Sequence, residues 1–208
     1  MLKQNFWKIL GKMGKMFDYE YNVVYSCDTK KYYNMKKMII DQAHSEIGFK
    51  VKHLMISTVK GNIGVFSGGV NENGEISVTM EMNSIGTNNS DRDNHLMSAD
   101  FFDVENFPTM EFNGTISETM DNVVGEITIK GITKEVVLDV DYNGHGVDPW
   151  GNTKHGWEIV GTINRGDFGL VWNAPLEAGG VMVSDEVKLN IDLQMMEVVE
   201  EMETSSVE

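Results

Sequence analysis

Hydrophobic and polar residues alternate with a period of two along most of the chain from residue 39 onward, which is typical of strands with one buried face. In the first alternating stretch Ile47, Phe49 and Val51 share one face, and Lys50 and Lys52 lie on the other. Seven further stretches of this kind follow at residues 59–70, 76–82, 110–116, 123–129, 136–142, 157–163 and 187–193. The pattern therefore predicts eight strands.

The connections between these strands indicate how they pair. Most are short, such as the turn at Asn71–Gly74, where Asn and Gly tolerate positive φ. Two are longer, at residues 84–112 and 165–184, and neither contains a helix of crossover length, which favours antiparallel over parallel pairing. Eight antiparallel strands can close into a barrel without free edges. We therefore predict an all-β barrel, with a two-sheet sandwich as the alternative.

The connection at residues 84–112 is the one long break in the alternating pattern. Ser90 followed by Asp93 predicts a helix start, because a hydroxyl at this position accepts from a free amide and acidic groups suit the positive helix end. A second short turn is expected from Ser98. We expect short helices within residues 88–105. Three aromatic residues in this polar segment must be buried, so it is expected to fold back over the core as a plug or lid: Phe101, Phe102 and Phe107.

Composition and charge restrict the classes of function. The 208 residues carry 32 acidic and 17 basic side chains, a net charge of −15. Such a surface repels phosphate backbones and anionic headgroups, which argues against nucleic-acid binding and against attachment to anionic membranes. Cys27 is the only cysteine, which excludes an intrachain disulfide and cysteine-rich metal sites. The sequence has no stretch of eighteen apolar residues, so stable membrane insertion is not expected.

The two ends of the chain differ from the alternating region. Residues 1–38 are rich in Lys, Met, Tyr and Asn without a sustained period, and predict either a disordered extension or a mis-assigned start with translation beginning at Met35. The barrel domain is expected at residues 39–195, and an acidic tail at 196–208. The N-terminus does not have the apolar core of a signal peptide, so a cytoplasmic location is expected, or a periplasmic or secreted one if the start is mis-assigned.

A series of short motifs occurs in unbroken order from about Ile39 to Gln194, and together they resemble the YceI-like family, the lipocalin-like polyisoprenoid-binding proteins. The matching motifs are His44-Ser45 with Phe49 and His53-Leu54, Gly61 with Phe66-Ser67-Gly68, Ser84–Thr87, Arg92–Leu96, Ser98–Asp103, Pro108, Gly125–Gly131, Asp148–Gly151, Ile163–Arg165, Asp167–Leu170 and Trp172-Asn173. The resemblance implies an extended eight-stranded antiparallel barrel, lipocalin-like, with a long apolar tunnel. It also implies a bound isoprenoid lipid, such as an isoprenoid quinone or a polyprenyl chain, and in many members a homodimer. The chain departs from the family in having no secretory signal and in its first 38 or so residues, which have no counterpart.

The favoured function is therefore binding, storage or transport of a long isoprenoid lipid, with no cofactor besides this ligand. Inward side chains expected to line the tunnel are Phe49, Val51, Phe66, Met80, Phe112, Ile127, Leu138, Phe168 and Trp172. The same residues fit a solid barrel core, and the sequence does not separate a hollow from a filled interior. Arg92, His95 and Arg165 are expected either to lock the connections to the barrel or to contact the lipid headgroup at its mouth.

A lipid-modifying or hydrolytic enzyme that uses His95 with Asp93 or Asp100 is the alternative. The sequence shows no recognisable nucleophile motif, and its five histidines show no HExxH or HxH spacing. We therefore expect no catalytic residue and no metal ligand.

Overall fold

The computed structural model describes residues 36–117, 119–174 and 181–198, all within one compact unit, Met35–Glu208. The expectations for residues 1–35 and for the tail beyond Val198 fall outside the described residues. The first strand begins at Met38 and the last ends at Glu197, so the barrel extends slightly beyond the expected limits of 39 and 195.

Strands dominate the described chain. In chain order the elements are β1 (Met38–Ile40), the 3₁₀ turn η1 (Gln42–His44), β2 (Glu46–His53), β3 (Ser57–Ile63), β4 (Phe66–Val70), β5 (Glu75–Glu81), η2 (Met82–Ser84), β6 (Ile85–Gly86), α2 (Ser90–Met97), β7 (Thr109–Ile116), β8 (Asn122–Ile129), β9 (Ile132–Val147), β10 (Thr153–Asn164), η3 (Arg165–Phe168) and β11 (Val183–Glu197). All the strand pairs are antiparallel.

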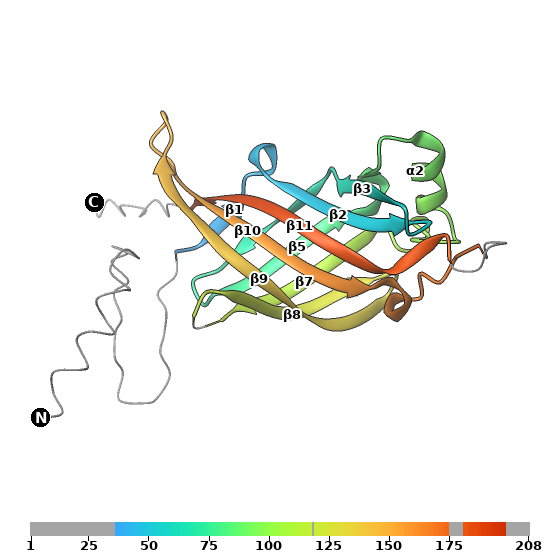
Figure 1. The fold of residues 1–208 in the computed structure, drawn as a ribbon. Coiled ribbons are helices and arrows are strands. Elements are labelled where there is room, and N and C mark those ends of the chain that lie inside the picture. Colours follow the sequence, from blue (N-terminus) through green and yellow to red (C-terminus); the bar gives the residue numbers. More distant parts are fainter. Residues whose placement is uncertain (1–35, 118, 175–180, 199–208) are drawn as a thin grey trace, which may run out of the picture. The chain divides into compact units, whose positions relative to one another are not determined.

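Short interruptions divide three long passes of the chain into two strands each: β1 and β2, β3 and β4, and β5 and β6. Together with β7 to β11 they make eight passes around the barrel (Figure 1). Hydrogen bonding runs in the order β1–β4–β5–β7–β8–β9–β10–β11 and back to β1, while β2, β3 and β6 continue from β11. The predicted eight-stranded closed antiparallel barrel is confirmed.

A polar network at the β1–β2 bend closes the ring. The amide of Asp41 donates to Gln194 O at 2.8 Å, and the amide of Gln194 donates to the Ser45 hydroxyl at 2.9 Å. Lys154 on β10 forms an ion pair with the Asp41 carboxylate at 2.5 Å. This contact, with hydrogen bonds from His44 and Gln194, lowers the pKa of Asp41 to about 2, although partial burial opposes the shift. The seam between the first and last strands is therefore held by charge as well as by backbone pairing.

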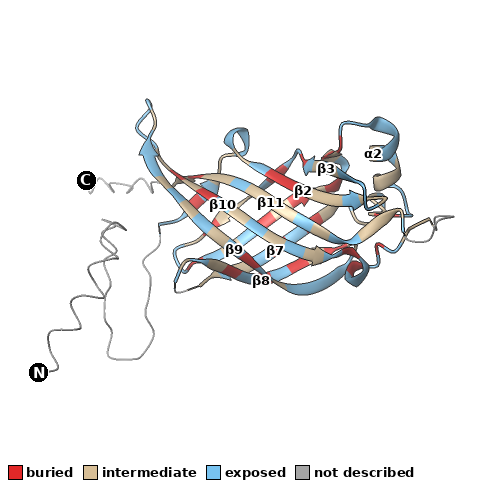
Figure 2. Cartoon of the chain, in the orientation of Figure 1, coloured by how far each residue is buried: buried red, intermediate tan, exposed pale blue. Residues whose placement is uncertain are grey.

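Buried and exposed positions alternate along the strands, as the sequence pattern predicts (Figure 2). On β8, Val123, Ile127 and Ile129 are buried, whereas Val124 and Glu126 between them are exposed. The buried set faces the barrel interior and forms one hydrophobic core with side chains from the other strands.

The helix α2 lies at one end of the barrel, here called the helix end (Figure 1). Its N-cap is Asn89, whose side chain accepts from the Arg92 amide at 2.9 Å, so the expectation that Ser90 caps the helix is wrong by one residue. Residues 98–106 form turns rather than a second helix. Phe101 is buried and Phe102 is half-buried, as expected for a segment that folds back on the core. Among the described helices, none has the length and apolar character needed to cross a membrane.

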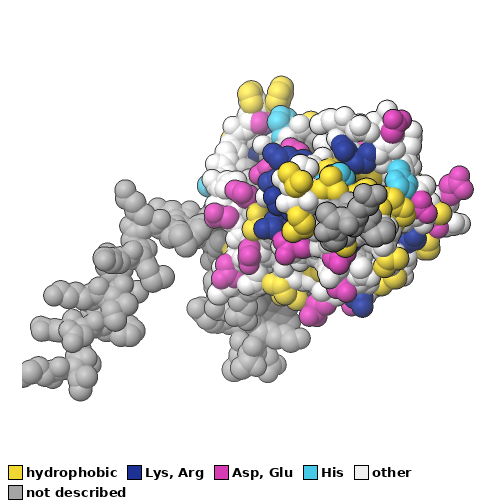
Figure 3. Space-filling model, turned by 45° about the vertical axis from the view of Figure 1, so that its right-hand side comes forward, with side chains coloured by type: hydrophobic (Ala, Val, Ile, Leu, Met, Phe, Trp, Pro, Cys, Tyr) yellow, Lys and Arg dark blue, Asp and Glu magenta, His cyan; other side chains and the backbone are white. Residues whose placement is uncertain are grey.

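The surface carries its charges unevenly. Figure 3 shows the helix end turned toward the viewer, with acidic side chains spread around the visible face. Hydrophobic and basic side chains lie beside one another near the centre of this view. The surface of the helix end therefore contains hydrophobic and basic side chains, although the chain as a whole is acidic.

Candidate functional site: an apolar cavity inside the barrel

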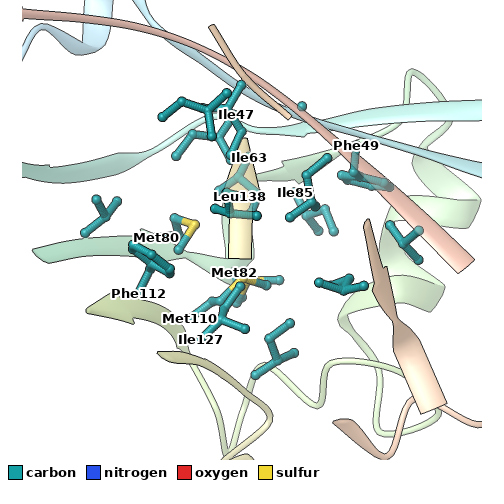
Figure 4. Close-up of a pocket in the computed structure, with 18 of the residues that line it drawn as sticks. Ile47, Phe49, Ile63, Met80, Met82, Ile85, Met110, Phe112, Ile127 and Leu138 are labelled. Atoms are coloured by element: carbon teal, nitrogen blue, oxygen red, sulfur yellow. The ribbon is translucent and has the colours of Figure 1, made fainter. Parts of the chain in front are cut away.

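A cavity runs through the barrel interior. Its volume, counted as the space open to the centre of a water-sized sphere, is about 200 Å³. At one end it is lined by Ile40 and Met195, near the seam, and at the helix end by Leu96, Phe101 and Phe102. In between, its wall carries Ile47, Phe49, Val51, Ile63, Ile76, Val78, Met80, Met82, Ile85, Met110, Phe112, Val123, Ile127, Ile129, Leu138, Ile159, Ile163, Arg165, Leu170, Val183, Val187, Leu189, Ile191 and Leu193 (Figure 4).

The interior is hollow partly because large side chains lie against glycines on neighbouring strands. Phe49 on β2 is directly opposite Gly61 on β3, and a methyl group at Gly61 would overlap the Phe49 ring. In the same way, a methyl group at Gly161 on β10 would overlap the δ-methyl of Leu138 on β9. These side chains can lie flat against the wall because the glycines leave room. Of the two possibilities that the sequence left open, a hollow and a filled interior, the structure has the hollow one.

The cavity wall is almost entirely hydrocarbon, with four methionine thioethers at positions 80, 82, 110 and 195. Methionine is unbranched and adapts its shape easily, so these positions can follow an irregular ligand surface. An apolar cavity of this kind does not hold water well, because water needs polar partners. The space is suited to an apolar ligand.

Arg165 is the one charged residue on this lining within the part of the chain that the structure describes, and it is 4% exposed. Its Nε donates to Ser184 O at 3.0 Å, and one terminal nitrogen donates to both Leu170 O and Trp172 O. The other terminal nitrogen donates to Val183 O at 3.3 Å and pairs with Asp185 at 3.2 Å. Since a guanidinium has five N–H groups, these contacts occupy all of them. In this arrangement Arg165 fastens the connection after η3 to the start of β11 and has no donor left for a ligand.

The structure brings together most of the side chains predicted to line a tunnel. Six of the nine lie on the cavity wall: Phe49, Val51, Met80, Phe112, Ile127 and Leu138. Phe66 and Phe168 are buried in the surrounding core, at 4% and 2% exposure, but do not line the cavity. Trp172 also does not line it, and instead packs at the helix end against His95 and Phe101.

The two other residues predicted at the mouth lie on α2. Arg92 donates from Nε to the Thr87 hydroxyl at 2.6 Å and from a terminal nitrogen to Thr87 O at 2.8 Å. The His95 Nε2 lies 3.1 Å from the Asp100 carboxylate. The His95 ring also makes edge contacts with Phe101 and Trp172, with centroids 5.1 and 4.8 Å away. Both side chains hold the helix end together.

Two neighbouring hydroxyls bear on the hydrolase alternative. Thr87 donates to Asp93 at 2.5 Å, and Ser98 donates to the carbonyl of His95 at 2.7 Å. Each is engaged in a structural hydrogen bond rather than directed at the His95 ring, so neither is placed as a nucleophile. Among the described residues, no cluster of three or more His, Cys, Asp or Glu could hold a metal ion.

Several lining residues were missed at the sequence level, including Met82, Ile85 and Leu170, which are all buried. Met82 is the last apolar position of the alternating stretch at residues 76–82, although in the structure it begins the 3₁₀ turn η2. Ile85 follows this turn and lies outside the alternation. Leu170 lies in an irregular connection, where no periodicity could identify it. The alternation could have identified Met82, whereas for Ile85 and Leu170 the available signal was their apolar character beside predicted strands.

Comparison with known proteins places this barrel in a family. A family model described as the YceI-like domain matches residues 39–195. A UPF0312 protein of Staphylococcus epidermidis is 44% identical over 162 residues, which cover 74% of this chain and 94% of that protein. A UPF0312 protein of Staphylococcus aureus is 42% identical over 161 residues, with the same coverage.

Solved structures are similar over the same region. The YCEI protein of Campylobacter jejuni is 33% identical, with a TM-score of 0.61, and the match covers 77% of this chain and 97% of that one. A polyisoprenoid binding domain from Saccharophagus degradans has a TM-score of 0.62 at 14% identity, covering 79% of this chain and 100% of that one, and shares the fold. The family model and the staphylococcal relatives together show that this chain belongs to the YceI-like family.

Proposed function

We propose that this protein binds a long isoprenoid lipid, such as an isoprenoid quinone or a polyprenyl chain, inside the barrel and serves as its carrier or store. The observation that carries the proposal is the cavity that runs from the seam to the helix end on an almost wholly hydrocarbon wall. The name of the Saccharophagus degradans domain, a polyisoprenoid binding domain, gives further support. The proposal is for a binding protein, not an enzyme.

The polarity of the site favours a ligand whose buried part carries no charge. An ionised carboxylate placed inside would require a cationic or hydrogen-bonding partner. Arg165, which could have supplied one, donates to four carbonyl oxygens and pairs with Asp185. A neutral quinone or polyprenol chain meets no such requirement.

The size of the cavity fits part of such a chain. Because one water-sized group needs about 10–15 Å³ on this measure, a cavity of about 200 Å³ holds roughly fifteen carbon-sized groups, or about three isoprene units. At about 0.8 kcal/mol for each buried methylene-sized group, three units would contribute on the order of 10 kcal/mol before the costs of association. Those costs amount to several kcal/mol or more, so a chain of only one or two units would bind weakly.

The test is to narrow the cavity with Leu138→Trp. Leu138 is 6% exposed and lines the cavity, so the larger indole should shorten the preferred chain. Overpacking costs about 1–3 kcal/mol, which a domain of this size can tolerate. The matched control is Val137→Trp on the same strand, since Val137 is 57% exposed and its added bulk points away from the barrel. Both variants are folded, loaded with a mixed set of polyprenols and isoprenoid quinones, extracted and analysed by mass spectrometry.

Wild type and Val137→Trp should retain the same chain lengths, whereas Leu138→Trp should shift toward shorter ones. An unchanged length distribution and amount in a folded Leu138→Trp protein would mean that the ligand does not occupy the cavity.

A further inference from the structure

The hairpin between β2 and β3, at the helix end, presents apolar side chains to solvent. Met55 is 67% exposed and Ile56 is 85% exposed. Leu54 and Met55 both have positive φ, at 54° and 56°, a conformation that Asn and Gly usually supply in tight hairpins. The amide of Leu54 donates to Met182 O, which places the hairpin beside the start of β11. A turn that is apolar, exposed and strained is unfavourable in water, which indicates that it contacts another molecule.

Two further exposed apolar residues occur at the helix end. Val181 is 43% exposed near the start of β11, and Val171 is 72% exposed in the connection that Arg165 fastens. Figure 3 shows hydrophobic and basic side chains side by side on this end. We define the apolar tip as Leu54, Met55, Ile56, Val171 and Val181.

Directly behind the tip, three lysines lie in register across the outer face of the barrel. Lys188 on β11 is opposite Lys50 on β2, and Lys50 is opposite Lys60 on β3. Lys52 follows on the same outer face, nearer the turn. Like charges directly opposite each other destabilise a sheet. Lys188 forms an ion pair with the exposed Glu186 at 3.7 Å. Among the described residues no ion pair involves Lys50, Lys52 or Lys60.

Acidic side chains occupy a matching row farther from the tip. Asp141, Glu158, Asp192 and Glu46 are in register across β9, β10, β11 and β2, and all four are exposed. On β2 and β11 this row lies four residues from the lysine row, which is roughly 13 Å along a strand. These two rows are therefore separated along the barrel, with the lysines nearer the helix end. Two exposed acidic residues at the start of β11, Asp185 and Glu186, also lie at this end, where they pair with Arg165 and Lys188.

We propose that the helix end docks on an anionic phospholipid bilayer, with the apolar tip entering the headgroup layer and the lysine row facing lipid phosphates. This interaction goes beyond the proposed function, and its test needs no bound isoprenoid. The lysine row lies roughly 13 Å behind the turn, so the tip reaches the boundary of the acyl chains while the lysines remain at the headgroups. When the lysines lie at the headgroups, the acidic row lies roughly 13 Å farther from the bilayer. This distance exceeds the screening length of about 8 Å at physiological salt, so the repulsion between the acidic row and the lipid phosphates is weak.

The experiment measures co-flotation of the full chain with vesicles of phosphatidylcholine containing one-third phosphatidylglycerol, and with vesicles of phosphatidylcholine alone. One variant combines Met55→Ser and Ile56→Ser, and a second combines Lys52→Gln and Lys60→Gln. The matched control combines Val147→Ser and Trp150→Ser, which remove two equally exposed apolar residues from the β9–β10 hairpin, at 68% and 83% exposure. Thermal melting verifies that each protein is folded.

Wild type and control should bind the anionic vesicles in a salt-sensitive way and bind the neutral vesicles more weakly. The lysine variant should lose roughly 10- to 30-fold in affinity, because each lysine at an anionic surface contributes about fivefold. The tip variant should lose affinity for both vesicle types. Failure of wild type to float, or an equal loss in the control, would overturn the proposal. So would self-association of wild type that the tip variant abolishes, since the tip would then bind a second copy of the chain.

Discussion

Single glycines have a large influence on the shape of the cavity. Gly161 stands beside Leu138 with no other side-chain neighbour within contact distance, and its missing methyl group is what lets Leu138 lie against the wall. Gly61 does the same for Phe49, although there the carbonyl of Gly86 is also close. Gly161 is therefore the better position for a test, because a methyl group added there would meet Leu138 and not a backbone carbonyl.

Gly161→Ala should push the δ-methyl of Leu138 into the cavity without moving the backbone. The expected result is a smaller amount or a shorter length of bound isoprenoid, with a small change in thermal stability. Lipid extraction with mass spectrometry measures the first quantity, and thermal melting the second.

Gly146→Ala is the control, because an added methyl group there meets open space. An equal change in ligand content in both variants would show that the space beside Leu138 does not determine ligand binding.

The buried guanidinium of Arg165 holds the helix end through contacts that one substitution removes together. Arg165→Met leaves the carbonyls of Leu170, Trp172 and Ser184 without this donor, and an unsatisfied buried group costs about 1–3 kcal/mol. We expect a total loss of about 3 kcal/mol, or a fall in melting temperature on the order of 10 °C. The exposed Lys60→Met should change stability by less than about 0.5 kcal/mol. Equal melting temperatures for both variants would contradict the role given to Arg165.

The sequence predicted which faces point inward but not what lies between them. Phe49 and Val51 could be assigned to the interior because strict alternation leaves no other arrangement. The hollow centre depends on cross-strand pairs such as Phe49 with Gly61, and register between strands is not visible in one sequence. Likewise, Arg165 could not be assigned to a structural role, because its partners come from an irregular connection and from β11.

At the scale of elements, the seam between β1, β10 and β11 is the place where the barrel closes. Backbone pairs join Met38 to Glu197 and Ile40 to Met195 over only three residues, so side-chain contacts at the adjoining bend matter. Asp41 takes part in most of them, with Lys154, His44 and Gln194.

The ion pair at the seam should make stability depend on pH in acid. The pKa of Asp41 is lowered from 3.8 to about 2, mainly by the hydrogen bond from Lys154, so the folded state favours the charged carboxylate. The contribution of Asp41 is therefore fully present above about pH 5 and is lost as the pH falls through the folded pKa. Relative to Asp41→Asn, wild type should lose its advantage between about pH 5 and 2, as measured by urea unfolding at each pH.

Glu105→Gln, which removes an exposed carboxylate far along the chain from the seam, is the control and should follow wild type. A difference between wild type and Asp41→Asn that stays constant down to pH 2 would contradict the assignment.

The helix α2 shows which features of an element can be predicted from the local sequence. Asn and Ser are both favourable N-cap residues, so the signal from Ser90 and Asp93 predicts the helix but does not determine its first residue. The structure selects Asn89 because its backbone is extended, with φ −152° and ψ 108°, while Ser90 is already helical. Helix existence was predictable, but its boundary depended on how the chain leaves β6.

At the scale of the whole molecule, the barrel has two different ends joined by one apolar cavity. The end near the seam carries the long β9–β10 hairpin, and the helix end carries α2 and the apolar tip (Figure 1). An interior almost without polar groups is unfavourable unless apolar atoms fill it, since an empty cavity forfeits packing contacts. The shape and polarity of the interior therefore agree with the proposal that an apolar ligand binds there.

The presence of an isoprenoid in the barrel is tested most directly by measuring the mass and the lipid content of the protein after gentle purification from its own cells. Native mass spectrometry followed by organic extraction should find one lipid with an isoprenoid chain in each barrel, and its removal should lower the melting temperature. Recovery of no stoichiometric lipid, together with no uptake of added isoprenoid quinones or polyprenols, would contradict the central claim that the barrel holds an isoprenoid.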